Sequence, residues 1–328
     1  MERWRADVLG DEFEQLTLEL GEDPEGPVVA TLVRALPEEL PWWRFAHDQR
    51  PLHDVDVLYV HGWSDYFFQK RLARFWTAKG ARFYALDLRK YGRSLREGQT
   101  PGFTTDLAVY DEDIAAALEA RGDADGRRLV LLGHSTGGLT LSLWAARHPG
   151  LPAAVILNAP WLEFQVARSA VAPVVEFGAR YWPKDTAPQV DLGFYTRAQR
   201  EVADPADPVE VNLDWRPEQT MPVHSGWLNA VLTGQRTVSQ GLGIPAPVCV
   251  LLSTRTAIPA RWSSELTRAD SVLVVDDIAK AALKLGRTVT VERIDGALHD
   301  VFLSAHDARE DAYATLDRWV TGWNAACR

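Results

Sequence analysis

The most informative segment of the sequence is LVLLGHSTGG, which covers residues 129–138. An apolar run ends at Gly133, and a second apolar segment of helical character, residues 139–146, follows the motif directly. This order predicts a buried strand, a sharp turn and a buried helix, with Ser135 at the apex of the turn. Glycines on both sides of Ser135 allow the strained backbone that pushes a hydroxyl out at the top of a sheet. Because G-x-S-x-G is a short pattern, the alternative is a glycine-rich turn that holds an ordinary serine.

Short apolar runs and amphipathic segments alternate on both sides of this turn. We expect strands at Gln15–Leu20, Val28–Arg34, Val55–Val60, Arg82–Leu86, Leu129–Leu132, Ala154–Leu157, Val248–Leu252 and Thr288–Ile294. We expect helices at Phe67–Thr77, Leu107–Ala120, Gly138–Arg147, Asp277–Leu285 and Arg309–Trp323. Such alternation predicts an α/β fold with a mostly parallel central sheet and helices on both faces. The first two strands have no helix between them, so they should form an antiparallel hairpin at one edge.

The alternation is interrupted between Asn158 and Pro247, where prolines, aromatic residues and acidic residues mix without a clear period. We interpret residues 159–246 as a lid, or cap, inserted between two sheet strands of a single domain that covers residues 1–328. The segment is too short for a large core of its own, and it is rich in aromatic side chains. It should therefore lie over something apolar.

The composition limits the classes of function. The 35 basic and 45 acidic residues leave a net charge of −10, which argues against a partner such as nucleic acid. No apolar run approaches the roughly 20 residues that span a bilayer, so we expect no integral membrane association. The first residues mix charges of both signs without the apolar stretch of a signal peptide, so we expect a cytoplasmic protein. The oligomeric state stays open.

Metal and cofactor motifs are missing from the sequence. There is no H-E-x-x-H pattern and no Cys–His cluster, and no glycine-rich phosphate loop follows a strand. The two cysteines are too few for a structural zinc site, and Cys249 lies in an apolar run where it should be buried. We therefore expect neither a metal nor a cofactor.

With these motifs the sequence resembles the α/β-hydrolase family, especially its monoacylglycerol-lipase-like and serine-aminopeptidase-like branch. The resemblance rests on the serine motif, on His61-Gly62-Trp63 after the strand at Val55–Val60, and on the loop DLRKYGRS at residues 87–94. It implies the α/β-hydrolase fold, and it implies that the backbone amides of Trp63 and Thr136 form an oxyanion hole. The side chain of His61 and the loop at residues 87–94 should be structural.

A serine hydroxyl needs a base to take its proton. His299 follows the last expected strand by a short loop, where the resemblance places the family's histidine, and it fits the family's chain order of nucleophile, acid and base. His134 adjoins Ser135 in sequence, but we expect its side chain to point away across the turn.

The acid is harder to assign. Four residues without a carboxylate, residues 253–256, follow the strand at Val248–Leu252, where the family usually has its aspartate. After a detour, Ala269-Asp270-Ser271-Val272-Leu273 resembles the family's A-D-x-V-V signature, which implies Asp270. Asp276 and Asp277 stay open as alternatives, although they resemble the acidic first turn of the next helix.

These residues together predict a serine hydrolase that cleaves an ester of an apolar small molecule, with thioesters and amides left open. The alternatives are a non-hydrolytic small-molecule binding protein and an acyltransferase on the same fold. Ligand pockets are mostly apolar, so we expect tryptophans to line the substrate pocket. The candidates are Trp63, Trp161, Trp182, Trp215 and Trp227.

Overall fold

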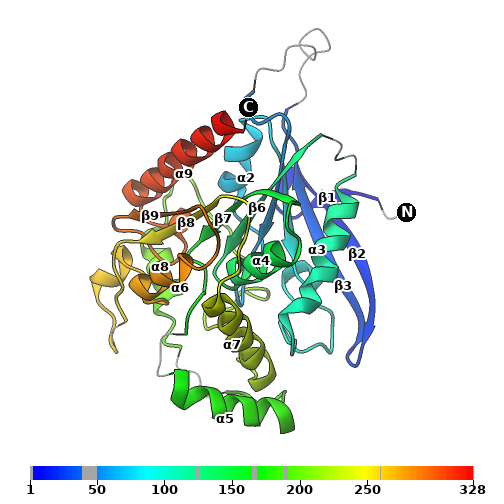
Figure 1. Cartoon of the computed structure of the whole chain (residues 1–328), viewed down its shortest axis with the longest axis vertical. Helices are drawn as coiled ribbons and strands as arrows, with labels where there is room; N and C mark the ends of the chain where they lie inside the picture. Colours follow the sequence, from blue (N-terminus) through cyan, green and yellow to red (C-terminus); the bar gives the residue numbers. More distant parts are fainter. Residues whose placement is uncertain are drawn as a thin grey trace.

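The computed structural model describes residues 3–38, 50–122, 124, 126–164, 168–187, 191–258 and 260–327. Within these ranges one nine-stranded sheet has the order β1-β2-β3-β5-β4-β6-β7-β8-β9 (Figure 1). The strands are β1 (Arg5–Asp7), β2 (Gly10–Asp23), β3 (Gly26–Ala35), β4 (Val55–Val60), β5 (Arg82–Asp87), β6 (Arg128–His134), β7 (Pro152–Asn158), β8 (Val248–Ser253) and β9 (Val289–Ile294). In this order the first three pairings, β1 with β2, β2 with β3 and β3 with β5, are antiparallel, and the remaining five are parallel. The α/β fold and its edge hairpin are confirmed.

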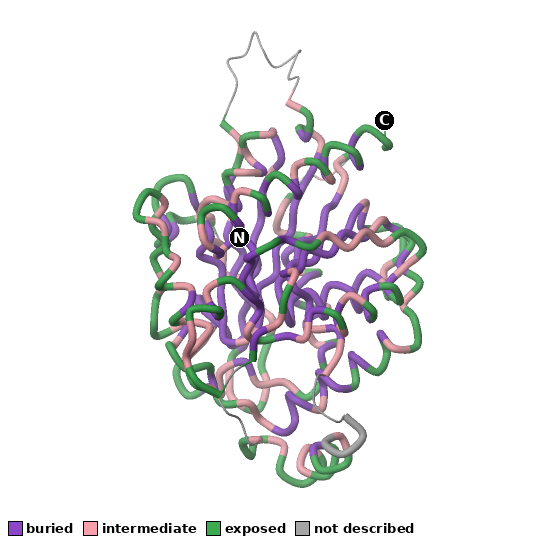
Figure 2. Tube along the Cα trace, turned by 90° about the vertical axis from the view of Figure 1, so that its left-hand side faces the viewer, coloured by how far each residue is buried: buried purple, intermediate pink, exposed green. Residues whose placement is uncertain are grey.

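The central strands are buried on both faces. All six residues of β4 are buried, and alternate side chains enter opposite cores. Leu58 and Val60 pack into one core, whereas Val57 and Tyr59 pack into the other, as the two-residue period of a strand requires. Figure 2 shows this buried centre, with the exposed chain around it.

Helices cover both faces of the sheet. The helices α3 (Tyr110–Ala120), α4 (Thr136–Arg147) and α8 (Val275–Ala282) contribute side chains to the core that contains Leu58. The helices α2 (Lys70–Thr77) and α9 (His306–Ala326) contribute to the core on the opposite face. The serine turn lies between β6 and α4, at the carboxyl edge of the parallel strands, where open α/β sheets bind their ligands.

The segment at residues 159–246, called the insertion below, connects β7 to β8. It contains the helices α5 (Arg168–Tyr181), α6 (Phe194–Glu201) and α7 (Ser225–Gln240). In Figure 1, α5 and α7 lie below the sheet, and α6 is labelled beside α8. Ten of the 16 residues of α7 are buried, and Gly234 of this helix lies against Leu139 and Leu143 of α4. The last part of the insertion therefore belongs to the main core, a regular helix where the sequence showed no period.

Element boundaries differ from the expected ones at a few places. The helix expected from Phe67 begins at Lys70, because Phe67 and Phe68 are buried in the core and the Phe67 amide donates to Asp87. The structure also contains the short strand β1, which was not expected. It pairs with β2 and extends the edge of the sheet.

Candidate active site

Ser135 lies on a sharply bent turn between β6 and α4. Its φ of 51° is in the left-handed region, which is unusual for a residue other than glycine and is typical of strained functional turns. A Cβ at Gly137 would lie 2.2 Å from the carbonyl oxygen of His61, and one at Gly133 would lie 2.7 Å from the Cα of Gly138. The turn therefore requires glycine at both positions, because the neighbouring backbone passes too close for any side chain.

The structure brings Ser135, His299 and Asp270 together. His299 lies in the loop after β9, and its Nε2 is 3.0 Å from the Oγ of Ser135, while its Nδ1 is 3.0 Å from the Oδ2 of Asp270. All three side chains are buried. With Nδ1–H donating to Asp270, the Nε2 lone pair is free to accept the serine proton.

Asp270 reaches His299 because the chain returns to the end of β8 after its detour. Thr256 and Asp270 form a parallel β-bridge, in which the Asp270 amide donates to the Arg255 carbonyl and the Ala257 amide donates to the Asp270 carbonyl. The Oδ1 of Asp270 accepts from the amides of Val272 and Leu273 at 2.7 and 2.8 Å, which fixes the carboxylate. The bridge thus places Asp270 beside the position where the sequence lacked an acid.

The two alternative acids lie elsewhere. Asp276 and Asp277 occupy the first turn of α8, as their sequence context predicted. The side chain of Asp276 is 68% exposed and pairs with Arg293, and that of Asp277 is 3.6 Å from Lys280. Neither carboxylate contacts His299.

The backbone amides of Trp63 and Thr136 flank Ser135. Trp63 follows β4, and Thr136 is the first residue of α4. A Cβ on Gly62, next to Trp63, would lie 3.0 Å from the Cβ of Ser135, so the two loops are in close contact. Among the described residues neither amide donates a hydrogen bond, and the N-terminus of α4 adds its positive potential.

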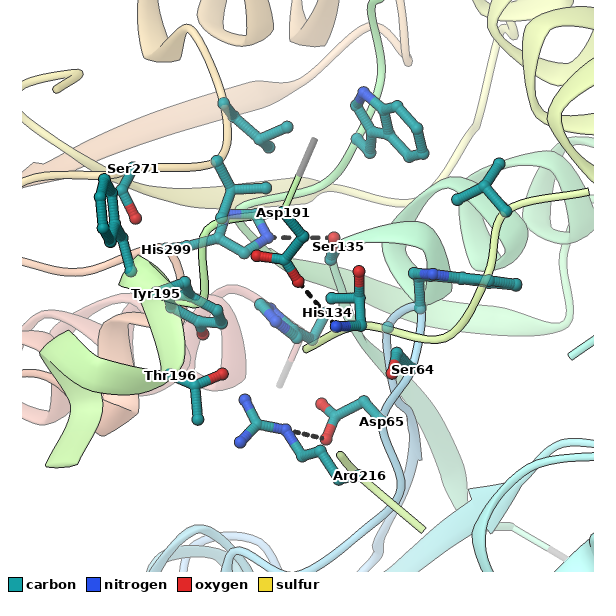
Figure 3. A pocket seen from close by; sticks show the side chains of 18 of the residues that line it. Ser64, Asp65, His134, Ser135, Asp191, Tyr195, Thr196, Arg216, Ser271 and His299 are labelled. Carbon is teal, nitrogen blue, oxygen red and sulfur yellow. Dashed lines mark hydrogen bonds and ion pairs between the residues drawn. The ribbon is translucent and has the colours of Figure 1, made fainter. Parts of the chain in front are cut away.

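A cavity of about 490 Å³ opens at Ser135 and His299. Trp63, Trp161 and Trp227 line it, and the ring centroids of Trp63 and Trp227 are 3.8 Å apart. Other parts of its wall carry polar side chains, many of which are labelled in Figure 3. They include Asp65, His134, Tyr195, Thr196 and Arg216.

Two of the expected pocket residues do not line this cavity. Trp182 follows α5 and is 55% exposed, packed against Phe177 and Tyr181. Trp215 packs edge-on against Tyr66 and lies 5.5 Å from the guanidinium of Arg93. The prediction for these two is wrong, because aromatic residues in the insertion also serve as surface and as packing between the insertion and the sheet.

The side chain of His134 lines the cavity, contrary to the expectation that it points away. Its ring lies 4.9 Å from that of His299, and its Nδ1 is 3.1 Å from the carbonyl oxygen of Asn158. Burial lowers the pKa of His134, so the ring is neutral near pH 7. Its Nε2 is 4.0 Å from Asp300, a fully buried acid that accepts from Gln69 and from the side-chain amide of Asn158.

The sequence also gave no indication of a buried ion pair in the cavity wall. Asp65 follows β4, and its Oδ1 is 2.9 Å from the Nε of Arg216, which belongs to the insertion (Figure 3). Burial raises the pKa of Asp65 to about 6 against the opposing effect of Arg216. Asp191 lines the cavity too, and its two oxygens accept from the backbone amides of Gly193 and Thr220.

The loop at residues 87–94 is held by its own contacts. The Nε2 of His61 accepts from the Leu88 amide, and Arg93 pairs with the buried carboxylates of Asp87 and Asp7. Lys90 stands where the α/β-hydrolase loop that this segment resembles usually has glycine. It has a φ of 63° and pairs with Glu25 of the edge hairpin. These contacts stabilise the loop and do not involve the cavity.

The described residues hold no cluster of three or more side chains suited to bind a metal ion. Cys249 is buried, as expected, and burial raises the pKa of its thiol well above the ordinary value. Among the helices of the described ranges, none combines the length and apolar character needed to cross a membrane.

Comparisons with known proteins agree with this architecture. The model of the family described as serine aminopeptidase, S33, matches residues 53–304. A monoacylglycerol lipase from Mycolicibacterium smegmatis is 27% identical over 254 residues, which cover 75% of this chain and 81% of that protein. The crystal structure of a monoacylglycerol lipase from Paleococcus ferrophilus has a TM-score of 0.63 at 18% identity, covering 82% of this chain and 94% of that one.

A soluble variant of the monoglyceride lipase from Saccharomyces cerevisiae has a TM-score of 0.65 at 14% identity, covering 98% of this chain and 99% of that one. Similarity to solved structures at such low identity speaks only for the fold, whereas the family match covers most of the sequence. The chain belongs to the serine aminopeptidase S33 family of α/β-hydrolases and is a serine hydrolase of the lipase and esterase type.

Proposed function

We propose that the protein hydrolyses esters that carry an apolar acyl or alcohol group, with Ser135 as nucleophile, His299 as base and Asp270 as the acid that orients His299. The observation that carries this proposal is the hydrogen-bonded chain from Asp270 through His299 to Ser135, at the floor of a cavity lined by tryptophans. A buried carboxylate that accepts a hydrogen bond from Nδ1–H selects the tautomer that acts as base, and it stabilises the imidazolium that forms.

In the proposed reaction, His299 takes the proton of Ser135 as its oxygen attacks the ester carbonyl. The tetrahedral oxyanion receives hydrogen bonds from the amides of Trp63 and Thr136, which have no other acceptor among the described residues. His299 then returns the proton to the departing alcohol, which leaves an acyl group on Ser135. A water molecule, deprotonated by His299, releases the acid and regenerates the serine.

The apolar part of the substrate would contact Trp63, Trp161 and Trp227, which line the cavity beside Ser135. The insertion supplies part of the cavity wall, so we propose that it acts as the lid of this site. The relatives named monoacylglycerol lipase make a monoacylglycerol one ester to include in the first substrate panel.

The test combines covalent labelling with turnover. A fluorophosphonate should label Ser135, and p-nitrophenyl esters from acetate to palmitate should be cleaved, together with a monoacylglycerol. Ser135→Ala should abolish labelling and lower kcat by about 10⁴-fold or more, while the fold is retained because one hydroxyl is lost. Ser142→Ala, at a buried serine of α4 whose hydroxyl donates to the Gly138 carbonyl, is the matched control and should keep turnover.

Retained hydrolysis in Ser135→Ala would overturn the proposal. Absence of labelling in the unmodified protein, together with tight binding of an ester that is not cleaved, would support the binding-protein alternative. Faster loss of ester on addition of a primary alcohol, with a new ester as product, would support acyl transfer.

A further inference from the structure

A second cavity of about 280 Å³ lies next to the one that contains Ser135. Thr196 and Arg216 line both cavities, so these two side chains form the partition between them. Much of the remaining wall is apolar and comes from both the insertion and the sheet side. These apolar residues include Phe68, Val202, Val209, Val211, Leu213 and Leu303.

Arg216 is fixed in the partition by partners on both sides. Towards the Ser135 cavity, its Nε is 2.9 Å from Asp65, and its guanidinium is 5.9 Å from the ring of Tyr195. Towards the second cavity, its Nη2 donates to the Oε1 of Gln199 at 2.8 Å, and it lies 5.4 Å from the ring of Phe68. Arg216 is only 9% exposed, so a bulky and always charged side chain fills the space between the two cavities.

The second cavity suits an alkyl chain better than a polar group. Its four other charged side chains pair with one another, because Arg309 pairs with Asp204 at 2.6 Å and Arg200 pairs with Glu218. The apolar side chains between them offer the kind of surface that methylene groups bury favourably. Arg216 closes that surface to a substrate bound at Ser135.

We infer that Arg216 is the length stop of the substrate pocket, and that the second cavity, which Arg216 separates from that pocket, can take the end of a longer alkyl chain. The kinetic test of this inference rests on the proposed ester hydrolysis. A chain that extends from Ser135 towards α6 meets the guanidinium of Arg216 and ends there, while removal of this side chain would join about 280 Å³ to the pocket of about 490 Å³.

The test removes the ion pair as a unit, because Arg216→Ala alone would leave the carboxylate of Asp65 buried without its partner. In Arg216→Ala/Asp65→Asn, the ratio of kcat/KM for p-nitrophenyl palmitate to that for p-nitrophenyl acetate should rise by at least about ten-fold, since even a single accommodated methylene is worth about that much. Arg216→Met/Asp65→Asn keeps the bulk without the charge and should leave the ratio near that of the unmodified protein.

The matched control is Arg197→Ala on α6. Arg197 stacks on Trp262 and pairs with Glu201, and it lines neither cavity, so its loss should leave the ratio unchanged. An unchanged ratio in Arg216→Ala/Asp65→Asn would overturn the length stop. An equal rise in the Met variant would overturn it too, because charge and not volume would then set the limit.

A binding experiment separates this inference from the proposed function. In Ser135→Ala, quenching of tryptophan fluorescence by hexadecanoate and by octanoate gives two dissociation constants, with and without the Arg216→Ala/Asp65→Asn change. Selective tightening for hexadecanoate supports the length stop even if no ester is ever cleaved, in which case only the proposed function fails. Equal changes for both acids would remove the length stop while leaving ester hydrolysis untouched.

Discussion

The two sides of the cavity are held in place by different means. On the sheet side, Ser135 sits on a turn whose backbone is fixed by close glycine contacts, and His299 is fixed by hydrogen bonds at both ring nitrogens. On the insertion side, Arg216 is fixed by one ion pair and by contacts between side chains. The chemistry proposed here therefore depends on the backbone of the serine turn and on the hydrogen bonds of His299, whereas the shape of the pocket depends on side chains that can be exchanged.

The largest effect is expected on the sheet side, at Asp270. Asp270→Asn should lower kcat by about 10⁴-fold, because an amide favours the wrong tautomer of His299. Asp276→Asn is the matched control, since its exposed carboxylate pairs with Arg293, and it should keep nearly full turnover. Steady-state kinetics with a short ester checks both, and an inactive Asp276→Asn beside an active Asp270→Asn would contradict the arrangement.

A smaller effect is expected on the free energy of unfolding, and it should differ between the buried and the exposed parts of the insertion. Trp227 of α7 is 1% exposed and packs on Trp63, so Trp227→Ala should lower the free energy of unfolding by about 3–5 kcal/mol. Trp182 is 55% exposed, and Trp182→Ala should change the same quantity by about 0.5 kcal/mol or less. Urea denaturation measures both. Equal losses would show that the insertion is anchored as one unit.

The smallest expected effect is a pH dependence that belongs to the ion pair of the insertion side. Burial raises the pKa of Asp65 from 3.8 to about 6, although the charges of Arg216 and His134 lower it, and Asp300 raises it further. The folded protein therefore holds the carboxyl proton of Asp65 more tightly than the unfolded chain does. The stability of the unmodified protein relative to Asp65→Asn should therefore fall as pH rises from about 4 to about 6. The pKa change corresponds to at most roughly 3 kcal/mol.

Denaturation curves of both proteins at pH 4, 5, 6 and 7 test this prediction. Other carboxylates contribute to both proteins and cancel in the difference, and Arg216 stays charged throughout. A difference that rises with pH would mean that Arg216 stabilises the carboxylate more than burial destabilises it.

The sequence predicts those parts of the molecule whose structure depends on residues close to one another in the chain. The turn at Ser135 and the strands around it follow from glycine positions and short apolar runs, and the fold follows from their alternation. The helix α7 was missed because two glycines and several β-branched residues lower its helix propensity, while burial against α4 compensates. The pair of Asp65 and Arg216 was missed because 151 positions separate its members, and only the folded insertion brings them together.

The aromatic residues show a second limit of sequence reasoning. Trp182 and Trp227 both lie in the insertion with apolar neighbours, yet one faces solvent and the other the cavity. Which of these side chains is covered depends on partners that are distant in sequence. His134 was misjudged for a related reason, since the direction of its ring depends on Asn158 at the end of the neighbouring strand.

The bridge between Thr256 and Asp270 closes a side loop whose two ends are adjacent. Closing a longer or shorter loop at the same two points changes the folding free energy little, by about 0.6 kcal/mol for each doubling of length. Residues in this loop, such as Ile258 and Leu266, line the cavity, while Asp270 stays at the fixed end. Insertions and deletions can thus accumulate here and reshape the pocket over evolution, or in a designed library, without displacing the carboxylate on which turnover is proposed to depend.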